Sequence, residues 1–166
     1  MIFSLVSILS RLPLRVLYWV ADWLLYPLIY YIARYRRKVV DRNLLIAFPQ
    51  HTPPERKRIA HDFYHQFCNT IVEIIYGYRC SEEEMRERVI FKNTEEVNQL
   101  VEKAGGGIFM LAHMGNWEWM ASFQQWLKNG ITEVNVYRTL KNKRMDRLML
   151  AIRAKRGGVC VEKQRI

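Results

Sequence analysis

The chain has 166 residues, half of them hydrophobic and 13% aromatic, so it can bury the core of one domain and is too apolar for general disorder. Its formal net charge of +10 favours an anionic partner, which would be a nucleic acid, an acidic membrane surface or a negatively charged substrate. Three widely spaced cysteines, Cys68, Cys80 and Cys160, give neither a disulfide framework nor a CxxC metal pair, and they favour a reducing compartment.

The first predicted element is an apolar helix over residues 16–33, in which Asp22 is the single charge. Its 18 residues would measure about 27 Å, at the short end of the lengths that span a bilayer. A signal peptide is disfavoured because the run is aromatic and lacks a small-residue cleavage site. The run predicts a membrane anchor, either spanning or lying in the interface. The remainder of the chain is expected on the cytoplasmic side, because four basic residues come next: Arg34, Arg36, Arg37 and Lys38.

Two helices are predicted after the anchor. Residues 39–49 form a short amphipathic helix closed by Pro49, and Thr52 caps a longer helix over 53–76. Helical spacing predicts the apolar stripe of that longer helix: Ile59, Phe63, Phe67, Ile71, Ile74 and Ile75. A neighbouring face carries His61, His65 and Cys68, which imitate a metal site. Because no fourth ligand is nearby, we interpret them as a solvated or partly buried helix face without metal.

Shorter elements then alternate between helix and strand, which indicates an α/β fold. Ser81 and Glu84 form a capping-box pattern that opens a short helix, and Asn93 or Thr94 caps a helix that ends at Ala104. The other predicted elements are strands at 89–91, 108–112, 134–137 and 159–161, helices at 117–127 and 141–156, and a turn at 129–130.

The chain is organised around residues 105–119, which read GGGIFMLAHMGNWEW. We predict a buried strand over 108–112 with His113 at its carboxyl end, where open α/β sheets usually hold their chemistry. Asn116 is a plausible N-cap, and Glu118 falls in the first turn of the following helix. His113 in the loop and Glu118 on the helix can converge, as a general base and the group that orients it. The amide groups near Asn116 would suit developing negative charge.

The HMGNWE sequence has the His-x4-Glu form of the glycerolipid acyltransferases, and its surroundings resemble the lipid A biosynthesis (late, secondary) acyltransferase family. The RNLLIAFP segment and the segment VYRTLKNKRMDRLMLAIRAKRGG extend the likeness over nearly the whole chain. Family members usually continue beyond this length, so we expect a C-terminally truncated chain that lacks further strands and part of the acceptor site.

The resemblance implies an N-terminal membrane-anchoring helix over residues 1–38, followed by an acyltransferase-like mixed sheet flanked by helices over 39–166. It implies transfer of an acyl group from an acyl carrier protein or coenzyme A thioester to a glycolipid or lysolipid hydroxyl, at the cytoplasmic face of the inner membrane. No cofactor or metal is implied. His113 would act as the general base and Glu118 would orient it, with substrate-binding residues at Asn116, Arg138, Asn142, Asp146 and Arg147.

Two other classes of function remain open at this point. A truncated or degenerate relative that binds anionic lipid without catalysis would keep the anchor and lose the reaction. A nucleic-acid binder is suggested only by charge, since the sequence has no zinc, helix-turn-helix or RNP pattern. We therefore expect no nucleic-acid partner.

Overall fold

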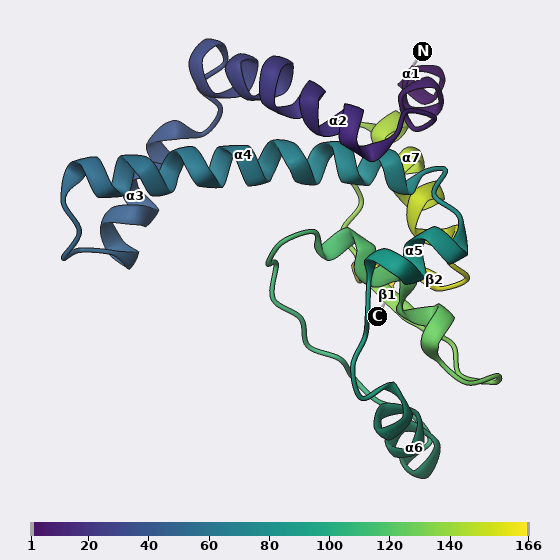
Figure 1. Cartoon of the computed structure of the whole chain (residues 1–166). Helices are drawn as coiled ribbons and strands as arrows, with labels where there is room; N and C mark the ends of the chain where they lie inside the picture. The colour runs from purple at the N-terminus through teal and green to yellow at the C-terminus, as the bar shows by residue number, and fades with distance from the viewer. Residues whose placement is uncertain (1, 166) are drawn as a thin grey trace. The chain divides into compact units, whose positions relative to one another are not determined.

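The computed structural model describes residues 2–165 and is mostly helical, with one small sheet (Figure 1). Packing divides the chain into two compact units. We call residues 12–73 the helical unit, and residues 1–11 together with 74–166 the mixed unit. The sequence predicted a different boundary, at residue 38, between a membrane anchor and a catalytic domain. That boundary is defined by function and not by packing, and it stays a prediction.

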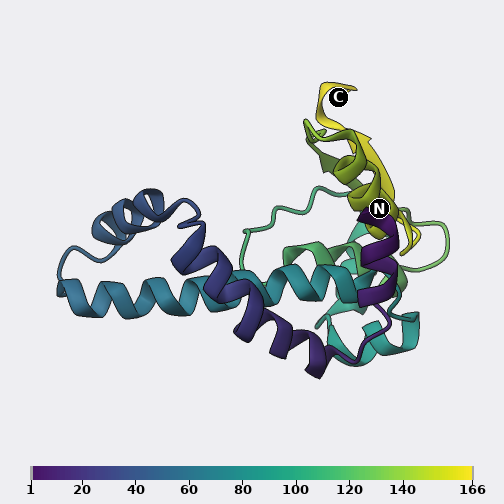
Figure 2. The same cartoon turned by 90° about the horizontal axis from the view of Figure 1, so that it is seen from above.

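The helical unit begins with one helical rod, residues 14–32, which lies beside α4 (Pro53–Gly77) in Figure 1 and crosses it obliquely in Figure 2. It comprises α2 (Leu14–Val20) and two π-helical turns, η1 (Ala21–Leu25) and η2 (Leu28–Ile32). The buried residues of the rod are Leu14, Leu17, Ala21, Tyr26 and Tyr30. Ala21 and Tyr26 are both buried although they lie five residues apart in the chain. The π-helical turn between them permits this, because its hydrogen bonds join residues i and i+5 and so give the turn one extra residue.

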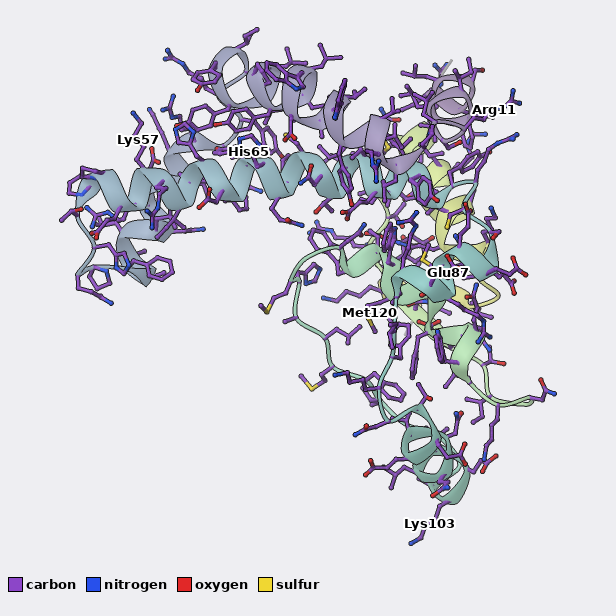
Figure 3. The ribbon with its side chains drawn as sticks, in the orientation of Figure 1. Arg11, Lys57, His65, Glu87, Lys103 and Met120 are labelled. Atoms are coloured by element: carbon purple, nitrogen blue, oxygen red, sulfur yellow. The ribbon has the colours of Figure 1, made fainter. Side chains whose placement is uncertain are left out.

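Hydrogen bonds between aromatic and titratable side chains hold the rod against α4. The hydroxyls of Tyr26 and Tyr30 lie 2.5 and 2.8 Å from the two ring nitrogens of His61. Burial lowers the pKa of His61 and raises that of Tyr26 to about 12. His65, labelled in Figure 3, lies 3.0 Å from the Asp22 carboxylate. A neutral imidazole has one donor and one acceptor nitrogen, so His61 can satisfy both tyrosines.

The predicted helices that follow the rod are confirmed as α3 (Arg37–Ala47) and α4. Thr52 and Glu55 hydrogen-bond to each other at the start of α4. The predicted apolar stripe of α4 is confirmed only in part: Ile74 and Ile75 pack against a buried cluster, whereas Phe63 is 46% exposed. The fully packed residues are instead Ala60, Tyr64, Cys68 and Val72. The physical reason is that Tyr64 and Cys68 follow His61 by three and seven residues, so they share the face bound to the rod.

A membrane span is not evident in any one helix. Among the described residues, every single helix is too short or too polar to cross a bilayer. The rod and α3 together, bent by 88°, meet the criterion by length and composition.

The mixed unit contains a β–α–β arrangement that the sequence predicted. Strand β1 (Val134–Tyr137) pairs in parallel with β2 (Val159–Glu162), and α7 (Lys143–Ala154) connects them. Val134 lies opposite Val159 in the register. The predicted stripe of α7 is confirmed: Leu148 and Ile152 are buried with Val6 of α1 (Ile2–Leu9), and Met145 and Met149 pack beside them. The turn at Gly130 is also confirmed, with φ of 93°.

The predicted strands at 89–91 and 108–112 are wrong. Both segments lack regular structure, and Ile90, Ile108 and Met110 are 72%, 95% and 94% exposed. A strand needs a neighbour to accept and donate its backbone hydrogen bonds. Within residues 2–165, β1 and β2 pair only with each other. The sheet of the described residues therefore has two strands, and the acyltransferase-like mixed sheet stays a prediction.

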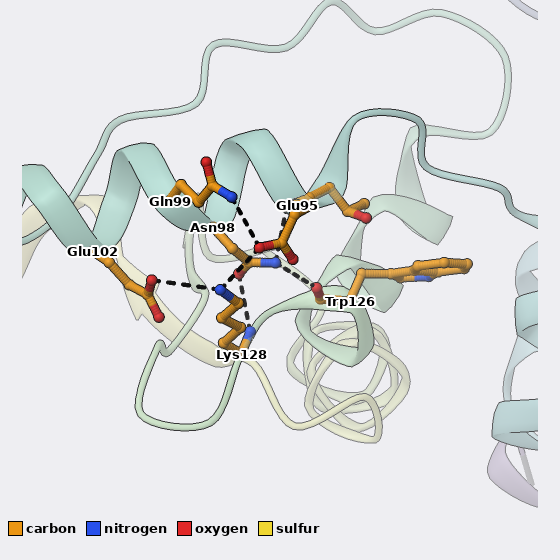
Figure 4. A network of polar contacts seen from close by, with 7 residues as sticks. Glu95, Asn98, Gln99, Glu102, Trp126 and Lys128 are labelled. Atoms are coloured by element: carbon orange, nitrogen blue, oxygen red, sulfur yellow. Dashed lines mark hydrogen bonds and ion pairs between the residues drawn. The ribbon is translucent and has the colours of Figure 1, made fainter.

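Local signals in the sequence predicted three further helices of the mixed unit. The capping box of Ser81 and Glu84 begins α5 (Glu82–Arg88), and Asn93 is the N-cap of α6 (Thr94–Ala104). The predicted helix at 117–127 is a 3-10 helix, η3 (Trp117–Trp126). Polar contacts tie α6 to the end of η3 (Figure 4). Asn98 donates to the Trp126 carbonyl and accepts from the Lys128 amide, while the Lys128 ammonium binds two carboxylates, Glu95 and Glu102.

The carbonyl end of α4 in the mixed unit is capped by two cations. Arg156 is 5% exposed and donates to the carbonyls of Gly77 and Ser81, at 3.1 and 3.3 Å. Lys155 donates to the carbonyls of Tyr78 and Cys80, at 3.1 and 3.2 Å. Burial lowers the pKa of Lys155. Cations are favourable at this end of a helix because the last carbonyls lack partners and carry the negative end of the dipole.

We expect Arg156→Met to lower the free energy of unfolding by about 2 kcal/mol, because it removes charged donors from two carbonyls. Urea unfolding of the full chain measures this. The matched control is Arg144→Met on α7, where the side chain is exposed. Equal stability of the two variants would show that the cap contributes nothing.

Candidate active site

A cavity of about 280 Å³ in the mixed unit collects most of the chemistry that the sequence predicted. Its walls come from the loop before η3, from η3 itself, from β1 and the segment after it, and from one face of α7. Met120, labelled in Figure 3, belongs to the η3 wall. The polar and charged lining residues are His113, Glu118, Asn135, Tyr137, Arg138, Asp146 and Arg153.

His113 reaches this cavity from an exposed loop. Its ring centroid lies 5.0 Å from that of Trp117, at an angle of 54°. In the part of the chain that the structure describes, His113 and Glu118 line the same cavity but share no hydrogen bond. His113 therefore lines the cavity from a loop and not from the end of a strand, and its role as the base stays a prediction.

Glu118 is held by a different partner, Arg153 of α7. The guanidinium binds the carboxylate through two parallel hydrogen bonds, Nε to Oε2 at 2.7 Å and Nη2 to Oε1 at 2.6 Å. The Glu118 side chain is 8% exposed and that of Arg153 is 22% exposed. The hydrogen bonds to Glu118 raise the pKa of Arg153. The cavity thus has one fixed anion–cation pair in its wall.

The other predicted site residues fall into two groups. Arg138 follows β1, is exposed and lines the cavity. Asp146 also lines it, but its carboxylate accepts the backbone N–H of Leu140 at 2.7 Å and so fixes the turn before α7. Asn142 caps α7 by accepting two backbone N–H groups, from Arg144 and Met145.

Three predicted residues are not among the lining of the cavity: Asn116, Asn142 and Arg147. Arg147 is exposed and donates to the carbonyl of Lys143, one turn earlier on α7. Asn116 is the N-cap residue of η3. Their proposed contact with substrate stays a prediction.

A metal centre has no support in the geometry. In residues 2–165, no three His, Cys, Asp or Glu side chains lie close enough to bind one ion. His61 and His65 are instead engaged by tyrosine hydroxyls and by Asp22. Cys68 is buried, which raises the pKa of its thiol to about 11 and leaves it protonated at neutral pH.

The residue that sequence reasoning missed is Arg153. The sequence contains a signal for Arg153 in the helical spacing of α7. Leu150 follows Asp146 by four residues and Arg153 follows Leu150 by three, so the three side chains share one face of the helix. That face lines the cavity, while the apolar stripe of the same helix packs against α1. The prediction of this helix named its apolar stripe and three residues near its start, Asn142, Asp146 and Arg147, but not Arg153.

Comparison with protein families matches residues 3–166 to the family described as bacterial lipid A biosynthesis acyltransferase. Comparisons with curated proteins and with solved structures gave no match.

We expect Arg153→Met to lower the free energy of unfolding by about 3–5 kcal/mol, because it leaves the Glu118 carboxylate buried without its partner. Urea unfolding measures the loss. The double variant Arg153→Met/Glu118→Gln should recover part of it, since no charge is then left buried. A double variant no more stable than the single one would show that the two substitutions act independently.

Proposed function

The chain belongs to the bacterial lipid A biosynthesis acyltransferase family, and on this premise we propose that it moves a fatty acyl group from an acyl carrier protein or coenzyme A thioester to a hydroxyl of a lipid A precursor or related glycolipid. The family establishes an acyltransferase. The donor, the acceptor and the roles of individual residues are parts of the proposal. The observation that supports them is the shared cavity of His113, Glu118, Arg138 and Arg153.

In the proposed reaction, His113 removes the proton from the acceptor hydroxyl as its oxygen attacks the thioester carbonyl. The carbonyl oxygen becomes an oxyanion, which the exposed guanidinium of Arg138 would stabilise. Collapse of the tetrahedral intermediate forms the ester and breaks the carbon–sulfur bond, and the imidazolium returns its proton to the leaving thiolate. The acceptor attacks directly, so no serine nucleophile is required.

Glu118 would orient the His113 imidazole and stabilise its protonated form, as the acid does in a Ser-His-Asp triad. The ion pair with Arg153 does not prevent this role. A carboxylate offers about four acceptor positions, and the two hydrogen bonds from Arg153 occupy two of them. An imidazole N–H can use a remaining position when substrate binding brings the loop toward η3. Long or absent catalytic hydrogen bonds are common before substrate binds.

We place the reaction at the cytoplasmic face of the inner membrane. The support is the apolar rod, which is followed directly by four basic residues, as is typical of the cytoplasmic side of an anchor. Phosphorylated headgroups and an acidic carrier protein are the partners that the net charge of +10 favours. No nucleic-acid partner is proposed.

The alternative is a protein that binds anionic lipid without catalysis. One observation favours it: His113 lies in an exposed loop instead of at the end of a buried strand. This alternative predicts that lipid binding survives while no acyl product forms.

We expect His113→Ala and Glu118→Gln each to lower the rate of acyl transfer by about 10²–10⁴-fold, the usual contribution of a positioned base. The assay uses membranes containing the chain, a labelled acyl-carrier thioester and a lipid A precursor. The control is His51→Ala, whose ring lies against Phe48 in the helical unit. Full activity in His113→Ala would rule out the mechanism, and absence of product from the wild type would favour the non-catalytic alternative.

A further inference from the structure

One face of α7 carries two ionisable side chains to which the proposed mechanism gives no role. Asp146 and Arg153 lie about two helical turns apart, so both side chains project from the same side of the helix. Both line the cavity, together with Leu150 between them. Asp146 is 8% exposed, and the Arg153 side chain is 22% exposed. Ionisable groups buried to this degree need partners, and the partners of these two belong to different walls of the cavity.

Asp146 holds the segment that carries Arg138. Its carboxylate accepts the backbone N–H of Leu140 at 2.7 Å, two residues beyond Arg138. The hydroxyl of Thr139, the residue between them, donates to the carboxylate of Glu162 on β2. On its other side, Arg138 directly follows β1, which is paired with β2. The backbone around Arg138 is therefore held on both sides, while its side chain is exposed at the cavity.

Arg153 holds Glu118 through its side chain. The two parallel hydrogen bonds between guanidinium and carboxylate set both the plane and the direction of the carboxylate. The pKa of Arg153 is raised chiefly by these hydrogen bonds, and the nearby charge of Asp146 also contributes. The two side chains on this face of α7 are therefore coupled electrostatically to each other as well as to the cavity walls.

Fixed placement matters most for the groups that would act on the reacting atoms. A cation that stabilises an oxyanion is effective only if it is in place before the charge develops. A displacement of about 1 Å, caused by a change remote from the chemistry, can slow a reaction about 10²-fold. Residues 138–140 have no regular structure of their own, so the position of Arg138 depends on the contacts of its neighbours.

We propose that Asp146 and Arg153 are positioning residues for acyl transfer: from one face of α7, Asp146 sets the place of Arg138 and Arg153 sets that of Glu118. This assignment rests on the acyl transfer proposed above. In it, α7 fixes two walls of the cavity relative to each other, and Asp146 acts on its neighbouring backbone instead of on substrate. The alternative is a direct role for the Asp146 carboxylate, as a substrate ligand or a proton acceptor.

Two substitutions of Asp146 in the full chain separate these roles. Asp146→Asn removes the acid but keeps an oxygen that accepts the Leu140 N–H, so we expect little change in kcat. Asp146→Ala removes the acceptor and should lower kcat about 10²-fold with KM nearly unchanged, because only the placement of Arg138 is lost. The control is Arg144→Gln, an exposed side chain of the same helix. Equal losses in Asp146→Asn and Asp146→Ala would overturn the proposal in favour of a direct role.

Double-mutant cycles test whether each residue acts through its partner. Arg138→Gln alone should lower kcat by about 10²–10³-fold, the usual effect of losing one group that stabilises an oxyanion. Adding Asp146→Ala to Arg138→Gln should then cost little more, because residues that act as a unit have non-additive effects. Adding Arg153→Met to Glu118→Gln should behave in the same way. Losses that multiply in either cycle would overturn the positioning role of that α7 residue.

The wild type separates this proposal from the proposed function. Absence of acyl product from the wild type would remove the proposed function, and the positioning roles with it. An active wild type with an equally active Asp146→Ala variant would overturn the positioning role alone. Hydrogen exchange at the Leu140 amide checks the contact itself, which should be lost in Asp146→Ala and kept in Asp146→Asn. If Asp146→Ala unfolds the whole chain, Asp146→Asn decides: a kcat near that of the wild type supports the proposal, and a loss as large as that of Arg138→Gln overturns it.

Discussion

The ion pair between Glu118 and Arg153 is the contact on which the mixed unit most depends. It joins η3 to α7 at the wall of the cavity, and both side chains are mostly buried. A few residues further on, Arg156 binds the carbonyl of Gly77 at the end of α4, and Lys155 binds the carbonyl of Tyr78 just after it. One stretch of four residues therefore links the cavity wall to the end of a long helix. Because buried charges and carbonyls cannot lose their partners cheaply, a shift of this stretch would disturb both places together.

Local signals in the sequence predicted most helices, because their evidence lies within a few residues. The capping box of Ser81 and Glu84 and the stripe through Leu148 and Ile152 each describe a single element. The strand at 108–112 could not be predicted in the same way. An apolar run shows that a segment could be buried, but a strand also needs a partner to which it can hydrogen-bond, and that is a property of the whole sheet. Fold class was therefore the weakest inference.

The buried face of the rod is a further feature that a uniform helical period does not predict. The rod advances five residues from Ala21 to Tyr26, and a 3.6-residue period places these two side chains on different faces. In α4, hydrogen bonds from Tyr26 and Tyr30 to His61 select a buried face beside the predicted apolar stripe. For the candidate site, one motif singled out His113 and Glu118, whereas Arg153 lies 35 residues beyond Glu118 in the chain.

The cavity holds its two central groups to different degrees. Glu118 is fixed by two hydrogen bonds, whereas His113 lies in a loop between Gly105 and Gly115, which both have positive φ values of 72° and 57°. Ordering a loop residue costs about 1–2 kcal/mol in backbone entropy, which substrate contacts would have to supply. If His113 is the base, binding of the acceptor and placement of the base are then one event. The selectivity of the enzyme for one acceptor over another would then depend on how well each acceptor orders the His113 loop beside the Glu118 carboxylate.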